Sequence, residues 1–377
     1  MCSIAASGGL EPLSLRGSWA RWRTHLQETK EQVPQPLLKL LFLRNRGIGI
    51  ITDCFEAGEK KQKRRGGAKG RVGGHMTHAC GHDVHTAVLM AVAQVLSQMR
   101  ADLPGTVRFL FQPAEEGAPS GEQGGAALMI REGALENPKP EVIFALHVNP
   151  NYSTGTLAYR PGATMASEDG LRILVRGRQT HGAMPWAGTD PIVIASQIVL
   201  GLQTIVSRQV NLPVAPAIIT IGSIHGGVRS NIIPEEVEMV GTIRTFEPVM
   251  RTDIHERIRK TAALIAKSGG AAAEVSIDPG YPVTFNDPNL TARMVPTLEA
   301  ATGRGHAVLM PPSTGAEDFS YYQQKVPGLF FFLGVTPPDR DPAQAPMLHS
   351  PRFYADERAL ILGIRTLARL TVASLEK

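Results

Sequence analysis

A regular pattern of apolar and polar segments begins near residue 76 and continues almost to the end of the chain. Short apolar runs bounded by turn residues are typical of buried strands, and apolar residues spaced three or four apart are typical of helices. The pattern first predicts a helix at 83–99, a strand at 106–111, a helix at 124–132 and a strand at 141–148. Strands that alternate with helices indicate a mainly parallel sheet with helices on both faces.

A second unit follows in the middle of the chain, with the order strand, helix, strand, strand, helix, strand. The expected ranges are 171–176, 190–207, 217–224, 236–244, 248–267 and 273–277. We expect Thr189 to cap the first of these helices, with Pro191 in its first turn. This order of elements is that of a ferredoxin-like module.

The α/β pattern then resumes and continues to the C-terminus. It predicts a helix at 288–301, strands at 306–310 and 329–333, and a closing helix at 356–375. The fold class is therefore α/β: a main domain with a mainly parallel sheet, interrupted by an inserted ferredoxin-like α+β domain. The expected boundaries are 75–165 and 279–377 for the main domain and 166–278 for the inserted domain.

Residues 1–74 form an atypical N-terminal region of uncertain fold. Helix-like patterns occur at 18–30 and 36–44, and Ile48–Ile51 could form a strand. This region holds 14 Lys and Arg against six Asp and Glu, a net charge of +8, so the rest of the chain carries −3. The basic run at 60–65 could contact phosphates, but no aromatic residues interleave it as in nucleic-acid platforms, and we interpret it as a solvated loop.

Composition narrows the class of protein further. The chain has 377 residues, 43% of them hydrophobic, and no apolar run approaches the ~20 residues that a membrane span needs. Its first residues lack the basic-then-apolar order of a secretory signal. The three cysteines are too few and too scattered for a disulfide framework. We therefore expect a cytoplasmic protein that binds neither membranes nor nucleic acid.

The densest chemistry lies at residues 78–85, His-Ala-Cys-Gly-His-Asp-Val-His. Side chains alternate along an extended backbone, so Cys80 and His82 can face the same way, and Gly81 allows a tight bend between them. A thiolate and a neutral imidazole are good ligands for a borderline-soft divalent metal. A plain helix start with Asp83 as N-cap is the alternative. It leaves Cys80 and His82 unexplained, so we favour metal binding.

Further donors are expected where strands end, which is where open α/β sheets bind ligands. Glu115 and Glu116 follow the strand at 106–111, His147 closes the next strand, and His349 lies in a loop after the last one. Singly, each has a simpler explanation: a surface Glu pair, a core histidine, an exposed loop. With the earlier thiol and imidazole they give five ligand side chains, enough for one or two metals, and leave Glu115 to accept a proton from a metal-activated water.

Several spaced segments resemble, in the same order, those of the metal-dependent amidohydrolases of the hippurate hydrolase, N-acyl-amino-acid hydrolase and indole-3-acetyl-amino-acid hydrolase family. The matching segments are 78–87, 112–117, 145–148, Thr-His-Gly-Ala-Met-Pro at 180–185, 226–234, 241–244, Gly-Ala-Glu-Asp-Phe at 315–319, and 348–351. The resemblance spans about residues 76–375. Because that family is related to co-catalytic zinc peptidases, it implies a zinc-exopeptidase-like catalytic domain with a lid and dimerisation domain inserted into it.

The resemblance also implies roles for the candidate residues. Two divalent metal ions (zinc, manganese, cobalt or nickel) would be bridged by Cys80, and the other ligands would be His82, Glu116, His147 and His349. Glu115 would be the general base that turns a water into the nucleophile and then protonates the leaving amine.

Residues of the inserted domain complete the implied site. His181 would reach the active site of the partner subunit in a homodimer and stabilise the oxyanion. Asn231 and Arg244 would hold the substrate. Arg244 would bind the free carboxylate of the substrate. Without the resemblance, His181 could simply precede a turn and Arg244 could be a strand-surface charge. His225 is a weaker candidate.

The implied reaction is hydrolysis of the amide bond of N-acyl or N-aroyl amino acids to a carboxylate and a free amino acid. One motif of the family is missing: a strand ending in Arg-Ala-Asp-Met-Asp-Ala-Leu-Pro, in whose place residues 51–55 do not match. Its loss would remove a central strand and a carboxylate that orients groups at the metals. The alternative is therefore a catalytically impaired relative that binds metal or ligand without turnover.

Overall fold

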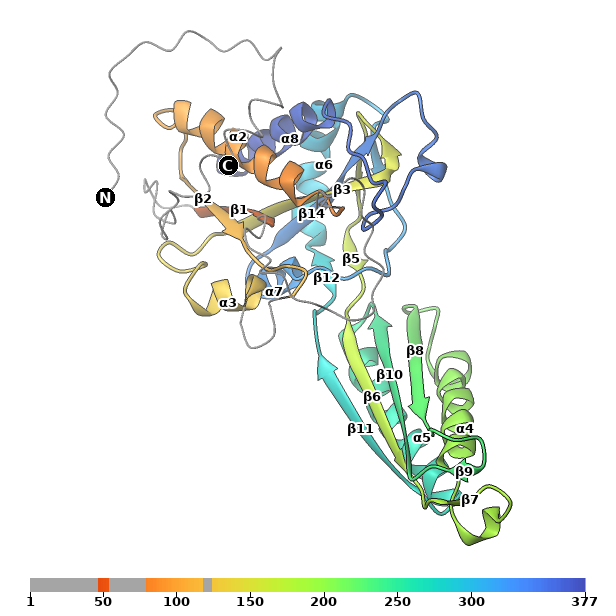
Figure 1. Cartoon of the computed structure of the whole chain (residues 1–377). Coiled ribbons are helices and arrows are strands. Elements are labelled where there is room, and N and C mark those ends of the chain that lie inside the picture. Colours follow the sequence, from red (N-terminus) through yellow and green to blue (C-terminus); the bar gives the residue numbers. More distant parts are fainter. Residues whose placement is uncertain (1–46, 54–78, 118–123, 377) are drawn as a thin grey trace, which may run out of the picture. The chain divides into compact units, whose positions relative to one another are not determined.

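The computed structural model describes residues 47–53, 79–117 and 124–376 (Figure 1). The helices expected at 18–30 and 36–44 and the basic run at 60–65 lie outside these residues.

A six-stranded sheet forms the main domain, with the order β13-β4-β14-β3-β1-β2. Its strands are β1 (Gly47–Asp53), β2 (Thr106–Gln112), β3 (Val142–Ser153), β4 (Leu157–Tyr159), β13 (Ala307–Leu309) and β14 (Gly328–Thr336). Every neighbouring pair is parallel except β14 with β4. The expected α/β class with a mainly parallel sheet is confirmed.

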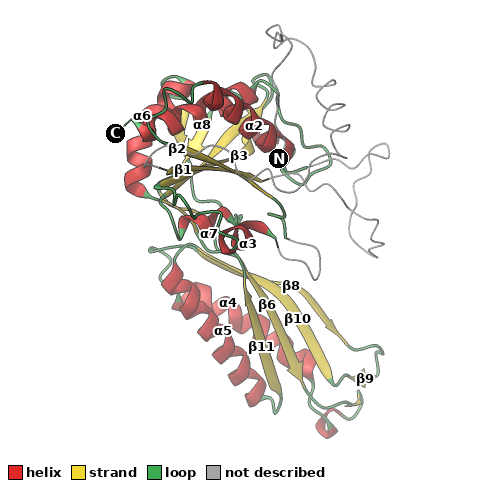
Figure 2. Cartoon of the chain, turned by 90° about the vertical axis from the view of Figure 1, so that its left-hand side faces the viewer, coloured by secondary structure: helices red, strands yellow, loops and turns green. Residues whose placement is uncertain are grey.

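Helices cover both faces of this sheet (Figures 1 and 2). One face carries α2 (His82–Gln98), α6 (Pro288–Thr302) and α8 (Ala359–Leu375); the other carries α3 (Gly125–Arg131) and α7 (Phe319–Gln323). Successive side chains of β3 alternate between the two cores: Phe144 and Leu146 join the first, Ile143 and Ala145 the second. Burial on both faces explains why this strand reads as a continuous apolar run.

Strand β1 lies inside the sheet, between β3 and the edge strand β2. Ile51 pairs with Ala145 of β3, and Asp53 pairs with Gln112 of β2. Four of its seven residues are β-branched, which favours a strand although the family motif is absent. The expected loss of this strand is therefore wrong. Residues 51–55 still differ in sequence from the family motif.

The middle of the chain forms a separate four-stranded antiparallel sheet, ordered β11-β6-β10-β8. Its elements in chain order are β6 (Asp169–Arg176), α4 (Pro191–Thr204), β8 (Ala217–Gly226), β10 (Glu236–Thr245), α5 (Pro248–Ser268) and β11 (Ala272–Pro279). Both helices lie on one face of the sheet (Figure 2). This is the ferredoxin-like arrangement expected from the sequence.

Helix α4 begins one residue later than expected. The Asp190 carboxylate accepts hydrogen bonds from the N–H groups of Ile192 and Val193, so Asp190, not Thr189, is the N-cap. With the π-helical turn Ile205–Gln209 that follows, α4 is long and apolar enough to cross a membrane by length and composition alone. Its inward face, however, packs in the core of the antiparallel sheet.

Short elements escaped the pattern. They are β5 (Gly162–Met165), β7 (Thr180–His181), β9 (Ile232–Ile233) and β12 (Thr284–Asn286), together with β4 and α7. The closing helix begins at Ala359 rather than at 356, because the Asp356 carboxylate accepts the N–H of Arg358 in the turn before it. Segments of two to five residues are too short to show a period.

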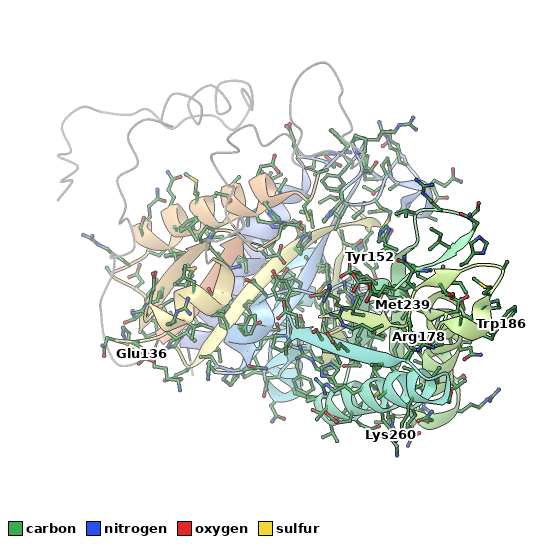
Figure 3. The ribbon with its side chains drawn as sticks, turned by 60° about the horizontal axis from the view of Figure 1, so that its bottom comes forward. Glu136, Tyr152, Arg178, Trp186, Met239 and Lys260 are labelled. Atoms are coloured by element: carbon green, nitrogen blue, oxygen red, sulfur yellow. The ribbon has the colours of Figure 1, made fainter. Side chains whose placement is uncertain are left out.

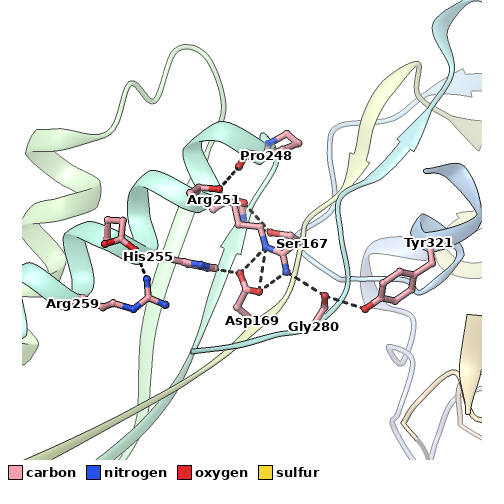
Figure 4. A network of polar contacts seen from close by, with 11 residues as sticks. Ser167, Asp169, Pro248, Arg251, His255, Arg259, Gly280 and Tyr321 are labelled. Carbon is pink, nitrogen blue, oxygen red and sulfur yellow. Dashed lines mark hydrogen bonds and ion pairs between the residues drawn. The ribbon is translucent and has the colours of Figure 1, made fainter. Parts of the chain in front are cut away.

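A buried carboxylate lies where the antiparallel sheet begins (Figure 4). The Asp169 side chain is fully buried and accepts hydrogen bonds from Nε of Arg251, at 2.9 Å, and Nε2 of His255, at 2.8 Å. Arg251 also donates to the main-chain oxygen of Gly280, which accepts a second hydrogen bond from the Tyr321 hydroxyl. Burial alone would raise the pKa of Asp169, but the hydrogen bonds from His255 and Arg251 outweigh it and hold the pKa below its usual value.

We expect Asp169→Asn to lower the free energy of unfolding at pH 7 by about 3 kcal/mol, because it leaves Arg251 without its buried counter-charge. Since the folded-state pKa of Asp169 lies below the unfolded value, this contribution is complete above about pH 4 and is lost as the pH falls through the folded value. Urea unfolding at about pH 7 and pH 3 measures it. Asp253→Asn, in an exposed pair with Arg257, is the control and should cost less than about 0.5 kcal/mol. A difference for Asp169→Asn that is the same at both pH values would contradict this account.

Candidate active site

Three segments distant in sequence meet at one edge of the six-stranded sheet. Strands β2 and β3 both run parallel to β1, so their carboxyl ends lie on the same side. The loop after β2 carries Glu115 and Glu116, and β3 carries His147. The N-terminus of α2, with Cys80 and His82, reaches the same place.

Gly81 makes the turn that aims the thiol and the first imidazole at this edge. Its φ of 86° is in the left-handed region, which favours glycine. A Cβ at this position would lie 2.4 Å from Cγ2 of Val148, so a larger residue does not fit. Gly81 is also the N-cap of α2, so Asp83 is not the cap but part of the first turn.

Two of the groups that the candidate donors form share one atom, the Cys80 sulfur, and His82 and Glu116 also form a group with Glu115. Cys80 with His82 and His147 forms one, and Cys80 with Glu116 and His349 the other; in each, the ligand atoms lie within 4.8 Å of one another. The Cys80 sulfur is 3.5 Å from Nε2 of His147 and 3.1 Å from Nε2 of His349. The structure thus brings together all five side chains named from the sequence.

His349 is tied to this cluster by its backbone. Its N–H donates to the main-chain oxygen of Ala79 at 2.7 Å, and its Nε2 lies 3.2 Å from Oε1 of Glu116. Its φ of 66° is left-handed, a conformation that costs a non-glycine residue about 1 kcal/mol and is concentrated at functional sites. The loop after β14 is therefore held against the Cys80 segment.

The two neighbouring glutamates have different surroundings. The Glu115 side chain is 10% exposed and its Oε2 lies 3.9 Å from Nε2 of His82, whereas the Glu116 side chain is 51% exposed. The main-chain oxygen of Glu115 accepts a hydrogen bond from the Tyr281 hydroxyl. Glu115 is thus the more enclosed of the two side chains, and its backbone is tied to Tyr281.

An acidic residue that the sequence analysis did not single out anchors the same loop. Asp318 is 2% exposed and accepts hydrogen bonds, each of 2.7 Å, from Nε2 of Gln112 and from the N–H of Ala126. Burial raises the pKa of Asp318 to about 6, against the effect of these hydrogen bonds. Its place in the Gly-Ala-Glu-Asp-Phe segment, which matches the family, could have marked Asp318 as a site residue. Asp318 and its neighbour Glu317 also lie within 4.8 Å of Glu115.

Burial favours the uncharged forms of His147, His85 and the Cys80 thiol. It lowers the pKa of His147 to about 4, despite the opposing hydrogen bond to Val148, and it lowers the pKa of His85 well below its usual value. Burial, with the negative charge of Glu116, raises the pKa of the Cys80 thiol. Neutral imidazoles are competent metal ligands, and a cation would favour the thiolate. The donor set therefore fits divalent metal ions.

The candidate substrate-binding residues of the inserted domain lie at two separate places. His181 and Asn231 are exposed and neighbouring: β7 pairs with β9 (His181 with Ile232), and the N–H of Gly182 donates to the main-chain oxygen of Asn231. Strand β10 begins beside β9 and ends far from it (Figure 1). Arg244 lies near that far end, about 25 Å along the strand from the first residue of β10. One chain therefore does not bring Arg244 together with His181 and Asn231. His225 is exposed on β8, opposite Glu238.

A pocket of about 600 Å³ lies in the inserted domain, not at the donor cluster. Its lining residues include Gly182, Asp190, Ile192, Arg229 and Ile232, which flank the β7–β9 pair. Trp186, from the same region, is 79% exposed and points away from the ribbon in Figure 3, whereas Met239 of β10 lies inside the sheet and helix layers.

A mainly parallel sheet that gathers thiol, imidazole and carboxylate donors at its carboxyl edge, beside a further enclosed carboxylate, defines a hydrolase-type site. The chain belongs to the Peptidase family M20/M25/M40, whose sequence profile matches residues 58–373. It is thus a member of a hydrolase family, and the resemblance found in its sequence motifs is confirmed.

Individual relatives agree with this assignment. The chain is 38% identical over 300 residues to the N-acetylcysteine deacetylase of Bacillus subtilis, covering 79% of this chain and 74% of that protein. It is 36% identical over 299 residues to an IAA-amino acid hydrolase of Arabidopsis thaliana, covering 78% and 66%. The crystal structure of the YXEP protein of Bacillus subtilis, a dinuclear metal-binding peptidase of the M20 family, superposes with a TM-score of 0.68 at 35% identity, covering 88% of this chain and 82% of that one.

We expect Cys80→Ser and His147→Ala each to weaken binding of zinc by about 100-fold or more, because each removes one donor from a group of three. Competition with a chromophoric chelator measures the affinity. His225→Ala, which removes an exposed imidazole from β8, is the matched control and should bind zinc like the unchanged protein. Equal affinities for His147→Ala and His225→Ala would show that the cluster does not hold the metal.

Proposed function

We propose that this protein hydrolyses the amide bond of N-acyl or N-aroyl amino acids to a carboxylate and a free amino acid, with two divalent metal ions as cofactors. The observation that carries the proposal is the pair of three-donor groups sharing Cys80, with Glu115 enclosed beside them. The deacetylase and the amino acid hydrolase among the relatives support the class of substrate.

The residues that would hold the ions are Cys80, His82, Glu116, His147 and His349. Their mixture of sulfur, nitrogen and oxygen donors suits zinc, manganese, cobalt or nickel. When bound, such ions supply Lewis-acid chemistry, which makes water more acidic and the amide carbonyl more electrophilic.

Glu115 is the general base in this proposal. Its carboxylate takes a proton from the attacking water while the water oxygen bonds to the amide carbon. It then delivers that proton to the nitrogen as the carbon–nitrogen bond breaks, so the amine leaves neutral. The hydrogen bond from the Tyr281 hydroxyl to its main-chain oxygen fixes the backbone that carries the Glu115 side chain.

The inserted domain would bind the substrate and the developing charge. Arg244 would pair with the free carboxylate of the amino acid, and Asn231 would donate to the substrate. His181 would donate to the oxyanion of the tetrahedral intermediate in the active site of the partner subunit. The distance along β10 between Arg244 and the other two supports this division between two chains, because one inserted domain cannot present all three at one point.

A homodimer through the inserted domain, which forms a unit from 166 to 278 in this proposal, would bring the two halves together. Among the described residues, β8 is an edge strand paired only with β10, and an unpaired edge invites a second strand. Apolar side chains are exposed on it and on the neighbouring α4, as an interface requires. They are Ile218, Ile224, Ile192, Val193 and Leu200.

We also assign the protein to the cytoplasm, where a reducing environment keeps the Cys80 thiol available. The alternative, a catalytically impaired relative, is motivated by the missing Asp-containing motif, in whose place residues 51–55 do not match. Bound metal without hydrolysis of hippurate or N-acetyl amino acids would favour that alternative.

We expect Glu115→Gln to retain bound metal but to lower kcat by about 100- to 10,000-fold, because the amide keeps the shape of the side chain but cannot accept the proton. Metal analysis and hydrolysis of hippurate and N-acetyl amino acids measure the two properties on the same sample. Glu132→Gln, at the exposed C-cap of α3, is the control and should match the unchanged protein. Full activity in Glu115→Gln would remove Glu115 from the mechanism.

Mixing two inactive variants tests the shared site. Glu115→Gln lacks the base but keeps His181, and His181→Ala lacks the oxyanion donor but keeps Glu115. If His181 serves the partner subunit, subunit exchange creates one complete site per mixed dimer and restores about a quarter of the wild-type rate. A mixture no more active than its components would place His181 in its own subunit's site, or outside the reaction.

A further inference from the structure

The backbone of Val148 holds two imidazoles. Pairing between β1 and β3 ends at Ala145, three residues before Val148. Beyond that point, the N–H of Val148 donates to Nε2 of His85 at 3.0 Å, and its C=O accepts from Nδ1 of His147 at 2.7 Å. The backbone of this one residue therefore hydrogen-bonds to a histidine of α2 and to a histidine of β3.

These two hydrogen bonds fix the tautomers of both rings. A backbone N–H only donates, so Nε2 of His85 carries a lone pair there; a backbone C=O only accepts, so Nδ1 of His147 carries a proton. The remaining lone pair of His147 is then on Nε2, the atom 3.5 Å from the Cys80 sulfur. The arrangement presents His147 to the donor cluster in the form that can bind a cation.

His85 also packs against the cluster directly. Its side chain is 1% exposed, and its ring centroid lies 4.4 Å from that of His147, with the planes at 67°, and 5.5 Å from that of His82. It follows His82 by three residues on α2, so the two side chains lie on the same side of the helix. His85 is in neither three-donor group that includes Cys80.

We propose that His85 is a positioning residue: by holding the N–H of Val148 and packing on the ring of His147, it aims Nε2 of His147 at Cys80. The proposal rests on the metal site proposed above and adds a histidine that binds no metal itself. It predicts that metal affinity depends on the hydrogen-bond acceptor at Nε2 of His85, and not on the volume of the ring.

Two substitutions separate the acceptor from the volume. His85→Gln can place its amide oxygen near the position of Nε2 and accept the N–H of Val148, whereas His85→Leu fills the space but leaves that N–H buried and unpaired. We expect the dissociation constant for zinc to rise about 10–100-fold in His85→Leu and to stay within a few-fold of the unchanged protein in His85→Gln. The visible absorption of the cobalt-loaded protein should change in His85→Leu only. Unchanged zinc affinity in His85→Leu, or equal losses in both variants, would overturn the proposal.

A measurement on the unchanged, metal-free protein keeps the test decisive if His85→Leu does not fold. Nitrogen-15 spectra of the histidine side chains should show two opposite assignments: His147 protonated at Nδ1, and His85 unprotonated at Nε2. A protonated Nε2 on His85 near neutral pH would refute the positioning role. Absence of zinc binding by the unchanged protein would instead refute the proposed metal site, while the spectra would still decide the tautomers.

Discussion

The Cys80 sulfur lies in two groups of candidate metal donors, and its position is the constraint on which the rest of the site depends. Cys80 can do so only because the next residue turns sharply in a conformation and a space that admit no Cβ. That turn starts α2, which buries His85 and presents His82. The loop carrying His349 is then fastened to the residue on the other side of Cys80. Displacing the sulfur would therefore disturb both groups together.

Parallel strand pairing supplies the remaining donors. Since β2 and β3 flank β1 and run the same way, the loop with Glu116 and the ring of His147 emerge at one edge although they are far apart in sequence. The same edge receives Asp318, which fixes the start of the Glu115 loop through Gln112. A fold with antiparallel strands in these positions would send every second strand end to the opposite edge.

The longer elements and two of the ligands, Cys80 and His82, could be predicted because their signals are local: apolar periodicity, and a thiol and an imidazole in one short motif. Glu116, His147 and His349 were named from their places after predicted strands and from the resemblance to a family. What escaped prediction depends on contacts between distant segments. Strand β1 was doubted because its residues differ from the family motif, yet its pairing with β2 and β3 keeps it in the sheet. The role of His85 depends on a main-chain N–H at Val148 that no pattern marks. The cap of α4 was misplaced by one residue because Thr189 and Asp190 are both good caps, and only the folded turn selects between them.

The two donor groups differ in how open they are to water. His349 and Glu116 have side chains 61% and 51% exposed, whereas His82 is 13% exposed and His147 is buried. Ions held by such unequal groups would exchange with solvent at different speeds, the outer one faster. Brief treatment with a chelator would then leave a half-loaded species, in which the inner position stays filled and the shared thiolate serves a single ion.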